Sequence, residues 1–230
     1  MVVKTRLLFH KEYPPYLNMG IDEALFTLFQ PDSSNILRIY TWKKEAHTIG
    51  RLQYINTIKS LLTYDTVVRR ITGGGVVSHG NDLTFSLICN PALFPLMGNT
   101  KNSYFFIHNA IATGLSKIGI KPVIHQSNKP EDYSDCACFN TPVKHDLLSN
   151  NTKIAGGAQH RKKNKFIHQG SLQNIFESVS IERVRDTLAY GFKEKMNLSF
   201  ISDELSSEET ALAEIFLTEK YSQDSWNYRR

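Results

Sequence analysis

Three consecutive glycines lie at the centre of a stretch whose residue types could bind an anion: Gly73, Gly74 and Gly75. A β-branched run before them predicts a buried strand that leads through Arg69 and Arg70 into the glycines. Glycine permits positive φ and lets a ligand approach the backbone closely. Guanidinium and main-chain N–H groups can both bind phosphate or carboxylate. The alternative interpretation is a glycine-rich hairpin turn with two solvated arginines.

Polar side chains follow the glycines, just before an apolar run at 83–88 that predicts another strand. They are His79, Asn81 and Asp82. A flexible loop held between two buried strands, with polar groups at its exit, is typical of a small-molecule site. We therefore interpret 67–88 as one wall of a ligand pocket.

Lys153 belongs to a second stretch that could do chemistry. It lies on a predicted strand and precedes the small residues of the sequence IAGGAQ. Small neighbours would let the lysine reach into a pocket, where its ammonium could hold a phosphate or carboxylate as a point charge. The alternative is a hairpin lysine that points to water, the commoner position of lysine.

The elements that must position these residues are predicted from periodicity and turn residues. The dipeptide at 150–151 predicts a tight turn between two short strands, and 162–165 predicts a second hairpin. Asp22 and Glu23 are interpreted as an ordinary acid pair in the first turn of a helix. Two helices are predicted, 19–29 capped by Asn18 and 104–118 stopped by Gly119. Strands are predicted at 4–10, as an edge or outer strand, and at 36–42, 46–50, 121–125, 143–148, 152–155 and 166–175.

Composition places the chain among cytoplasmic globular proteins. Its 230 residues, 41% of them hydrophobic, are sufficient for one domain with a sizeable core. Three cysteines are too few for a disulfide framework, so reduced thiols are expected at Cys89, Cys136 and Cys138. Cys136 and Cys138 with nearby His145 make a poor zinc site, because no second pair of thiols accompanies them. The net charge of +5 is dispersed and no nucleic-acid motif is present, so an acidic protein substrate accounts for it as well.

Several motifs, in order along the chain, resemble the lipoate-protein ligase A family, which is related to biotin protein ligases and to lipoyl and octanoyl transferases. They are NMGIDEAL, RRITGGGVVSHG, KIAGGAQ followed by HQGSL, and the tail EKYSQDSWNYRR. The similarity covers nearly the whole chain. It implies an α/β fold of the α+β type, a mixed β-sheet flanked by helices. We expect residues 1–230 to form a single catalytic domain without a C-terminal accessory domain.

The resemblance also implies roles for individual residues. In that family the lysine contacts the acyl carbonyl and the phosphate of an acyl-adenylate, and this role falls on Lys153. Substrate- or adenylate-binding roles are implied for Arg70, Gly73, Gly74, Gly75, His79, Asn81 and Gly156. The implied cofactors are ATP and Mg²⁺, with lipoate as substrate. No protein ligand to the metal is assigned, and Asp82 is the candidate carboxylate near Mg²⁺ bound with ATP.

Two chemistries follow from the resemblance. The leading hypothesis is a lipoate-protein ligase, which activates lipoate with ATP and transfers it to a lysine of a lipoyl carrier domain. The alternative rests on Cys138, which stands where related octanoyltransferases place a nucleophile. Its thiolate could form a thioester and transfer octanoate from acyl carrier protein. Against this, the glycine loop is more similar to that of the ligases, and a free cysteine is often a small buried hydrophobe. A non-catalytic binder of lipoyl domains is a third hypothesis, disfavoured by the intact Lys153 and glycines.

The implied partners are lipoyl domains of 2-oxoacid dehydrogenase complexes and the H protein of glycine cleavage. Acyl carrier protein and a separate accessory subunit are further partners that the sequence leaves open. We expect no nucleic-acid or membrane partner, and we expect a monomer.

Overall fold

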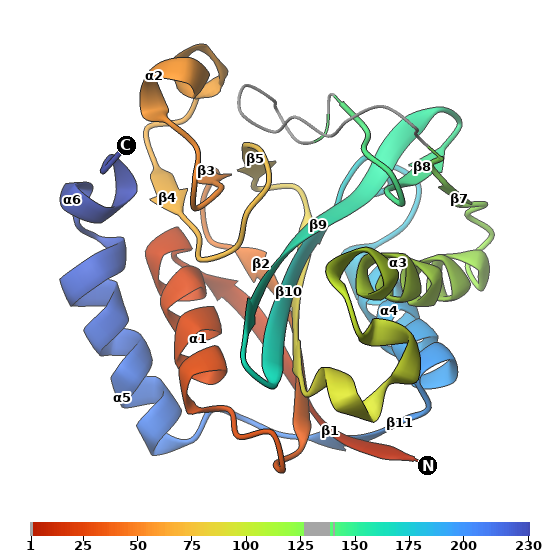
Figure 1. Ribbon diagram of the computed structural model, residues 1–230. Helices are drawn as coiled ribbons and strands as arrows, with labels where there is room; N and C mark the ends of the chain where they lie inside the picture. The colour runs from red at the N-terminus through yellow and green to blue at the C-terminus, as the bar shows by residue number, and fades with distance from the viewer. Residues whose placement is uncertain (1, 127–138, 140) are drawn as a thin grey trace.

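An eight-stranded mixed sheet forms the centre of the computed structural model, which describes residues 2–126, 139 and 141–230. The strand order is β11-β1-β2-β6-β10-β9-β8-β7 (Figure 1). β1 pairs in parallel with β11 and β2, and the remaining neighbours are antiparallel. The strands are β1 Val3–Tyr13, β2 Asn35–Trp42, β6 Leu83–Cys89, β7 Val123–Ile124, β8 Leu147–Ser149, β9 Thr152–Lys162, β10 Lys165–Leu172 and β11 Leu198–Ser202.

Helices cover both faces of this sheet, as Figure 1 shows. α1 (Pro15–Leu28) and α5 (Ser207–Phe216) pack on one face, and α3 (Thr100–Ser116) and α4 (Ile181–Met196) pack on the other. Side chains of β2 alternate between the two cores, because successive residues of a strand point to opposite faces. Leu37 and Ile39 lie in the core with α3 and α4, while Ile36 and Tyr40 lie in the core with α1 and α5. Helices on both faces leave β2 and β6 almost continuously buried.

A three-stranded sheet in the order β4-β3-β5 lies beside the large one and carries the glycines. Its strands are β3 Ala46–Ile49, β4 Val67–Arg69 and β5 Val77–His79. The glycines therefore join β4 to β5. Short helices complete the described chain: α2 Ile55–Ile58, η1 Lys59–Leu61, η2 Pro91–Leu93, η3 Pro95–Met97, the π-helical turn η4 Leu217–Tyr221 and α6 Asp224–Asn227. Each helix in the described part of the chain is too short or too polar to cross a bilayer.

The predicted turns are confirmed by the backbone. Asn150 and Asn151 both have positive φ, 49° and 63°, and join β8 to β9 as a tight hairpin. Lys163 has φ 52° in the hairpin between β9 and β10. Gly119, with φ 86°, follows the end of α3 at Ser116 and provides the left-handed conformation that often stops a helix.

Three sequence interpretations are wrong and a fourth is right only in part. β1, predicted as an edge or outer strand, is an outer strand but not the edge: it lies between β11 and β2, because a late parallel strand adds to its outer side. α1 begins at Pro15 rather than after Asn18, since proline is preorganised for the first helical position. Asn18 is buried inside the helix, where its amide donates to the carbonyls of Tyr13 and Thr41. Asp22 accordingly belongs to the second turn and does not form a first-turn acid pair. The strand predicted to start at 143 begins only at Leu147.

Candidate active site

A narrow pocket lies where the small sheet meets the large one. Its wall contains the apolar side chains of Met19, Trp42, Val77 and Phe139. Backbone from β9 completes the wall at Gly156, where the chain lacks side-chain bulk. The shape and lining fit a short apolar chain with a polar head group.

Arg70 holds the glycine loop (residues 70–76) in place. Its guanidinium donates to the carbonyl oxygens of Gly73, at 2.5 Å, and Gly75, at 2.8 Å. It also donates to the carbonyl and the hydroxyl of Thr48, at 3.1 and 3.2 Å. Gly74 has φ 83°, and a Cβ there would lie 3.0 Å from Arg70 Nη2. Arg70 was expected to contact phosphate, but in this structure its guanidinium donates hydrogen bonds to carbonyl oxygens of its own loop.

Arg69 is buried and faces the other way, toward the C-terminal segment. Its guanidinium donates to carbonyl oxygens of Gly50, Gln53 and Asn227 at 2.8–3.1 Å. Trp226 returns a hydrogen bond from its indole to the Arg69 carbonyl, at 2.7 Å. Burial and the neighbouring arginines lower the pKa of Arg69 to about 10. The tail that resembled the family's closing segment is thus tied to the start of the glycine loop.

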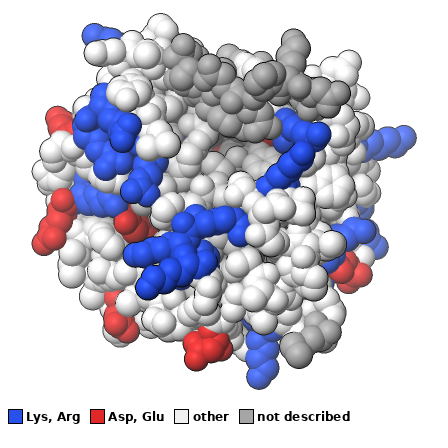
Figure 2. Space-filling view, in the orientation of Figure 1, with Lys and Arg blue, Asp and Glu red and all other residues white. Residues whose placement is uncertain are grey.

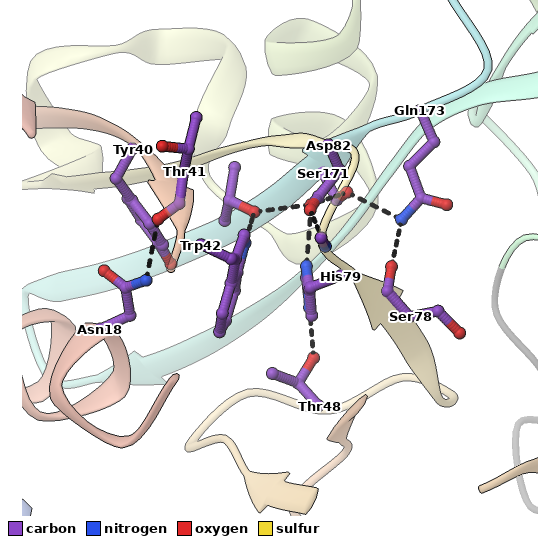
Figure 3. A network of polar contacts seen from close by, with 12 residues as sticks. Asn18, Tyr40, Thr41, Trp42, Thr48, Ser78, His79, Asp82, Ser171 and Gln173 are labelled. Atoms are coloured by element: carbon purple, nitrogen blue, oxygen red, sulfur yellow. Dashed lines mark hydrogen bonds and ion pairs between the residues drawn. The ribbon is translucent and has the colours of Figure 1, made fainter. Parts of the chain in front are cut away.

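His79 and Asp82 connect the glycine loop to the large sheet (Figure 3). His79 Nδ1 lies 2.8 Å from Asp82 Oδ2, and its Nε2 lies 2.8 Å from Thr48 Oγ1. Because Thr48 Oγ1 accepts from Arg70, it can donate its proton to Nε2, which leaves Nδ1–H to donate to Asp82. The imidazole also stacks on Trp42, with ring centroids 3.9 Å apart. His79 is therefore a fixed part of the pocket wall.

Asp82 is buried and its carboxylate is fully used by protein donors. In addition to its contact with His79, the carboxylate accepts hydrogen bonds from the Ser171 hydroxyl at 2.7 Å, the Thr84 hydroxyl at 2.9 Å and the Gly80 N–H at 3.1 Å. Burial acts to raise its pKa, but His79 and these hydrogen bonds outweigh burial, and the pKa is lowered overall. The geometry gives no support to a magnesium role for Asp82, which stays a prediction. Asn81 is exposed next to it and does not line the pocket.

Lys153 is buried against the pocket wall and forms an ion pair that sequence reasoning missed. Its ammonium lies 2.6 Å from Asp146 Oδ2, and the two side chains are 1% and 0% exposed. A Cβ at Gly156 would lie 2.8 Å from the ammonium, so only glycine leaves room for it there. The ammonium also lies 5.1 Å from the ring of Phe139. Lys153 thus places a positive charge behind the pocket and does not point to water.

Tyr104 fixes the partner of that lysine. Its hydroxyl donates to Asp146 Oδ1 at 2.6 Å and accepts from the Gly157 N–H at 2.8 Å. The N–H of Val143 donates to the other carboxylate oxygen at 2.8 Å. Helix α3 therefore positions the Lys153–Asp146 pair. The only sequence signal for this ion pair was Asp146 itself, just before β8, and a single acidic residue there does not identify its partner without the fold.

A second buried network, around Asp22, supports the floor of the pocket. Asp22 pairs with Arg38 at 2.7 Å and accepts from Tyr40, Ser86 and Gln169 at 2.7–2.9 Å. Gln169 and Tyr40 both line the pocket. Asp22 is thus a structural acid inside the core rather than a solvated helix residue.

The cysteines divide between the described and the undescribed parts of the chain. Cys136 and Cys138 lie outside the described residues. Cys89 is fully buried in β6, where burial raises the pKa of its thiol far above the ordinary value. Phe139, the residue after Cys138 in the sequence, lines the pocket. In the described residues, no three histidine, cysteine or acidic side chains gather in a way that could hold a metal ion.

These features define the class of the protein. Arg70, His79 and Gly156 line one apolar pocket, and Lys153 is buried next to Gly156. Gly73 lines a neighbouring hollow, and Asn81 lies outside the pocket. A mixed sheet between two helical layers is also the fold of solved lipoate-protein ligase structures. The family described as the lipoyl protein ligase A/B catalytic domain matches residues 14–206, and the chain belongs to it. The expected family and fold are confirmed.

Relatives within this family carry two kinds of names. The chain is 28% identical to octanoyltransferase LipM of Clostridioides difficile (strain 630), over 98% of each chain. It is also 28% identical to octanoyltransferase LipM of Staphylococcus aureus (strain NCTC 8325 / PS 47), over 94% of this chain and 95% of that protein. Among solved structures, protein Ta0514 of T. acidophilum superposes with a TM-score of 0.84 at 24% identity, covering 99% of this chain and 100% of that one. Lipoate-protein ligase A bound with ATP superposes with a TM-score of 0.81 at 24% identity, covering 99% of each.

Proposed function

We propose that this protein is an octanoyltransferase that moves an octanoyl group from acyl carrier protein to a lysine of a lipoyl domain through a Cys138 thioester. This was the alternative hypothesis from the sequence. The observation that carries it is that Phe139, next in sequence to Cys138, lines the apolar pocket, with the buried ammonium of Lys153 5.1 Å from its ring. Nearly full-length similarity to octanoyltransferases supports the same choice.

The reaction proposed is two thioester substitutions in series. The Cys138 thiolate attacks the acyl carbonyl of the donor, and the thiol of the acyl carrier protein leaves with a proton. The amine of the acceptor lysine then attacks the enzyme thioester, which forms the amide and releases the Cys138 thiol. The apolar wall of the pocket would hold the octanoyl chain. The charge of Lys153 would favour the thiolate and the oxyanion of each tetrahedral intermediate.

The acceptor belongs to the proposal as well. A solved structure of a bi-partite lipoate protein ligase and its E2 lipoyl domain from Thermoplasma acidophilum has the same fold, with a TM-score of 0.78 at 21% identity. We infer that a lipoyl domain, from a 2-oxoacid dehydrogenase complex or the glycine-cleavage H protein, is the acceptor here.

ATP-dependent ligation of lipoate is the second candidate. The observation that favours it is the run of three glycines, beside a hollow lined by arginines. Against it, the guanidinium of Arg70 and the carboxylate of Asp82 are used by protein groups, so the two residues expected near ATP and Mg²⁺ are engaged elsewhere.

The deciding experiment is mass spectrometry of the intact protein after incubation with octanoyl-acyl carrier protein. Wild type should gain the mass of one octanoyl group, and Cys138→Ala should gain none. Cys136→Ala is the matched control and should still be acylated. Lys153→Ala should acylate about 100- to 1,000-fold more slowly, because it loses one preorganised charge at the reacting carbonyl. Transfer that needs lipoate and ATP and survives in Cys138→Ala would overturn the proposal in favour of the ligase.

A further inference from the structure

A basic hollow of about 490 Å³ opens on the outer side of the glycine loop. The side chains of Arg51, Arg229, Arg230 and His160 line it, together with backbone at Gly73. Figure 2 shows Lys and Arg side chains gathered over the C-terminal end of the chain and over the β9–β10 hairpin. This hollow was not anticipated from the sequence, where the positive charge looked dispersed.

The charges in the hollow have no acidic partner. Within the described residues, no ion pair includes Arg51, Arg229 or Arg230. The pKa of Arg229 is lowered by partial burial and by the charges of Arg51 and Arg230, so the three guanidinium groups repel one another. Glu23, an acid near His160, already pairs with Lys220 at 2.6 Å. Such a cluster is stabilised when it binds an anion.

Aromatic and backbone contacts hold these arginines in position. The Arg229 guanidinium lies 3.9 Å from the centre of the Trp226 ring, and its Nη2 lies 3.4 Å from the Arg51 carbonyl oxygen. The backbone carbonyl of Arg230 accepts a hydrogen bond from the Ile55 N–H at 2.9 Å. These contacts tie the C-terminal segment to the backbone around Arg51 and Ile55, and the arginines that line the hollow carry the planar, forked donors that suit a phosphate.

The hollow and the acyl pocket share a thin wall. Ala158 of β9 lines the pocket and the next residue, Gln159, lines the hollow. On the loop side, Gly73 lines the hollow while its neighbour Gly74 approaches Ala158. A donor whose acyl chain lies in the pocket would thus carry the rest of its arm past the glycine loop toward the arginines.

We propose that this hollow is the binding site for the phosphodiester of the phosphopantetheine arm of the acyl donor. The inference rests on the proposed function, which makes the donor a pantetheine thioester. That arm is neutral except at its phosphate, so the cationic cluster beside the acyl pocket matches its charge. The competing source of phosphate is ATP, and the experiment separates the two.

The test measures binding and transfer separately, with the full chain. Phosphopantetheine and pantetheine, which differ only in the phosphate, are titrated by calorimetry into wild type, Arg51→Gln and Arg229→Gln. Wild type should prefer phosphopantetheine, and each variant should lose about 10- to 100-fold of that preference, the usual value of a charge-assisted hydrogen bond. Arg183→Gln removes an exposed arginine of α4 and should keep the wild-type preference.

The transfer experiment compares octanoyl-phosphopantetheine with octanoyl-pantetheine. The ratio of their kcat/KM values should fall in Arg51→Gln and Arg229→Gln and stay constant in Arg183→Gln. An equal affinity of wild type for phosphopantetheine and pantetheine would overturn the inference, whether or not transfer occurs. So would ATP binding that is tighter than phosphopantetheine binding and lost in the same variants. Phosphate-dependent binding without any transfer would instead overturn only the proposed function.

Discussion

The ammonium of Lys153 on β9 lies 2.6 Å from the carboxylate of Asp146, and both groups are completely enclosed by protein. The carboxylate of Asp146 compensates the charge of the buried Lys153 ammonium, since an isolated charge in that site would strongly destabilise the folded protein. Tyr104 on α3 and the backbone of Val143 hold the carboxylate. The position of Lys153 is thus decided by a residue from a different element.

The first prediction concerns this pair. Asp146→Asn leaves the ammonium of Lys153 buried without a counter-charge, and we expect the free energy of unfolding to fall by about 3–5 kcal/mol. Adding Lys153→Met to Asp146→Asn should recover most of that loss, because the unpaired charge is removed. Urea unfolding measures both. Asp186→Asn, which breaks the exposed pair with Arg185, is the control and should cost about 0–1 kcal/mol. An Asp146→Asn protein with the wild-type urea midpoint would show that the pair contributes nothing to stability.

The second prediction concerns Gly156. A methyl group there would lie 2.6 Å from Lys153 Cε and 2.8 Å from Nζ, so Gly156→Ala must displace the lysine. We expect kcat/KM for acyl transfer to fall about 100-fold, the usual effect of shifting a catalytic group by about 1 Å. Gly98→Ala is the control, because a Cβ at Gly98 meets no atom within 4 Å. Equal activity of the two alanine variants would contradict the placement of Lys153 at the pocket wall.

The third prediction is the pH dependence that Asp82 gives to stability. Its pKa in the folded state is lowered below the ordinary value of about 3.9. The resulting stabilisation is therefore fully present above about pH 4 and is lost as the pH falls through the lower folded value. Asp82→Asn should be less stable than wild type by about 1–3 kcal/mol at neutral pH, and the difference should shrink in acid. Unfolding in urea at a series of pH values measures this, and a gap that widened in acid would reverse the assigned sign.

The fourth prediction separates Cys89 from the proposed nucleophile. The Cys89 thiol is fully buried and its pKa is raised by burial, so the thiolate that reacts with alkylating reagents does not form in the folded protein. We expect iodoacetamide to label Cys89 at least about 100-fold faster in urea than in the native protein. Peptide mapping by mass spectrometry locates the label. Rapid native labelling of Cys89 would mean that β6 opens, and would make that thiol a competitor in the thioester experiment.

The sequence determined the local features of this protein, because turn residues and motifs act over a few neighbouring positions. Asn150 and Asn151 have the side chains that tolerate positive φ, so the hairpin between β8 and β9 could be predicted without the fold. The end of α3 near Gly119 could likewise be predicted from the sequence alone. The glycine loop and Lys153 were found as candidates from residue type and spacing, and their motifs identified the family.

Only the tertiary structure decided how those candidates are used. Arg70 donates to the carbonyls of its own loop and to Thr48, and Asp82 accepts from Ser171 on a distant strand, so the use of each group depends on how the fold orients the loop against both sheets. Asp146 could not be connected to Lys153 from spacing alone, since a sheet register and a helix position together bring them into contact. The arginine-lined hollow arises in the same way, where Arg51 meets a segment almost 180 residues later in the chain. Charge that is dispersed along the sequence becomes a site when folding gathers it on one surface.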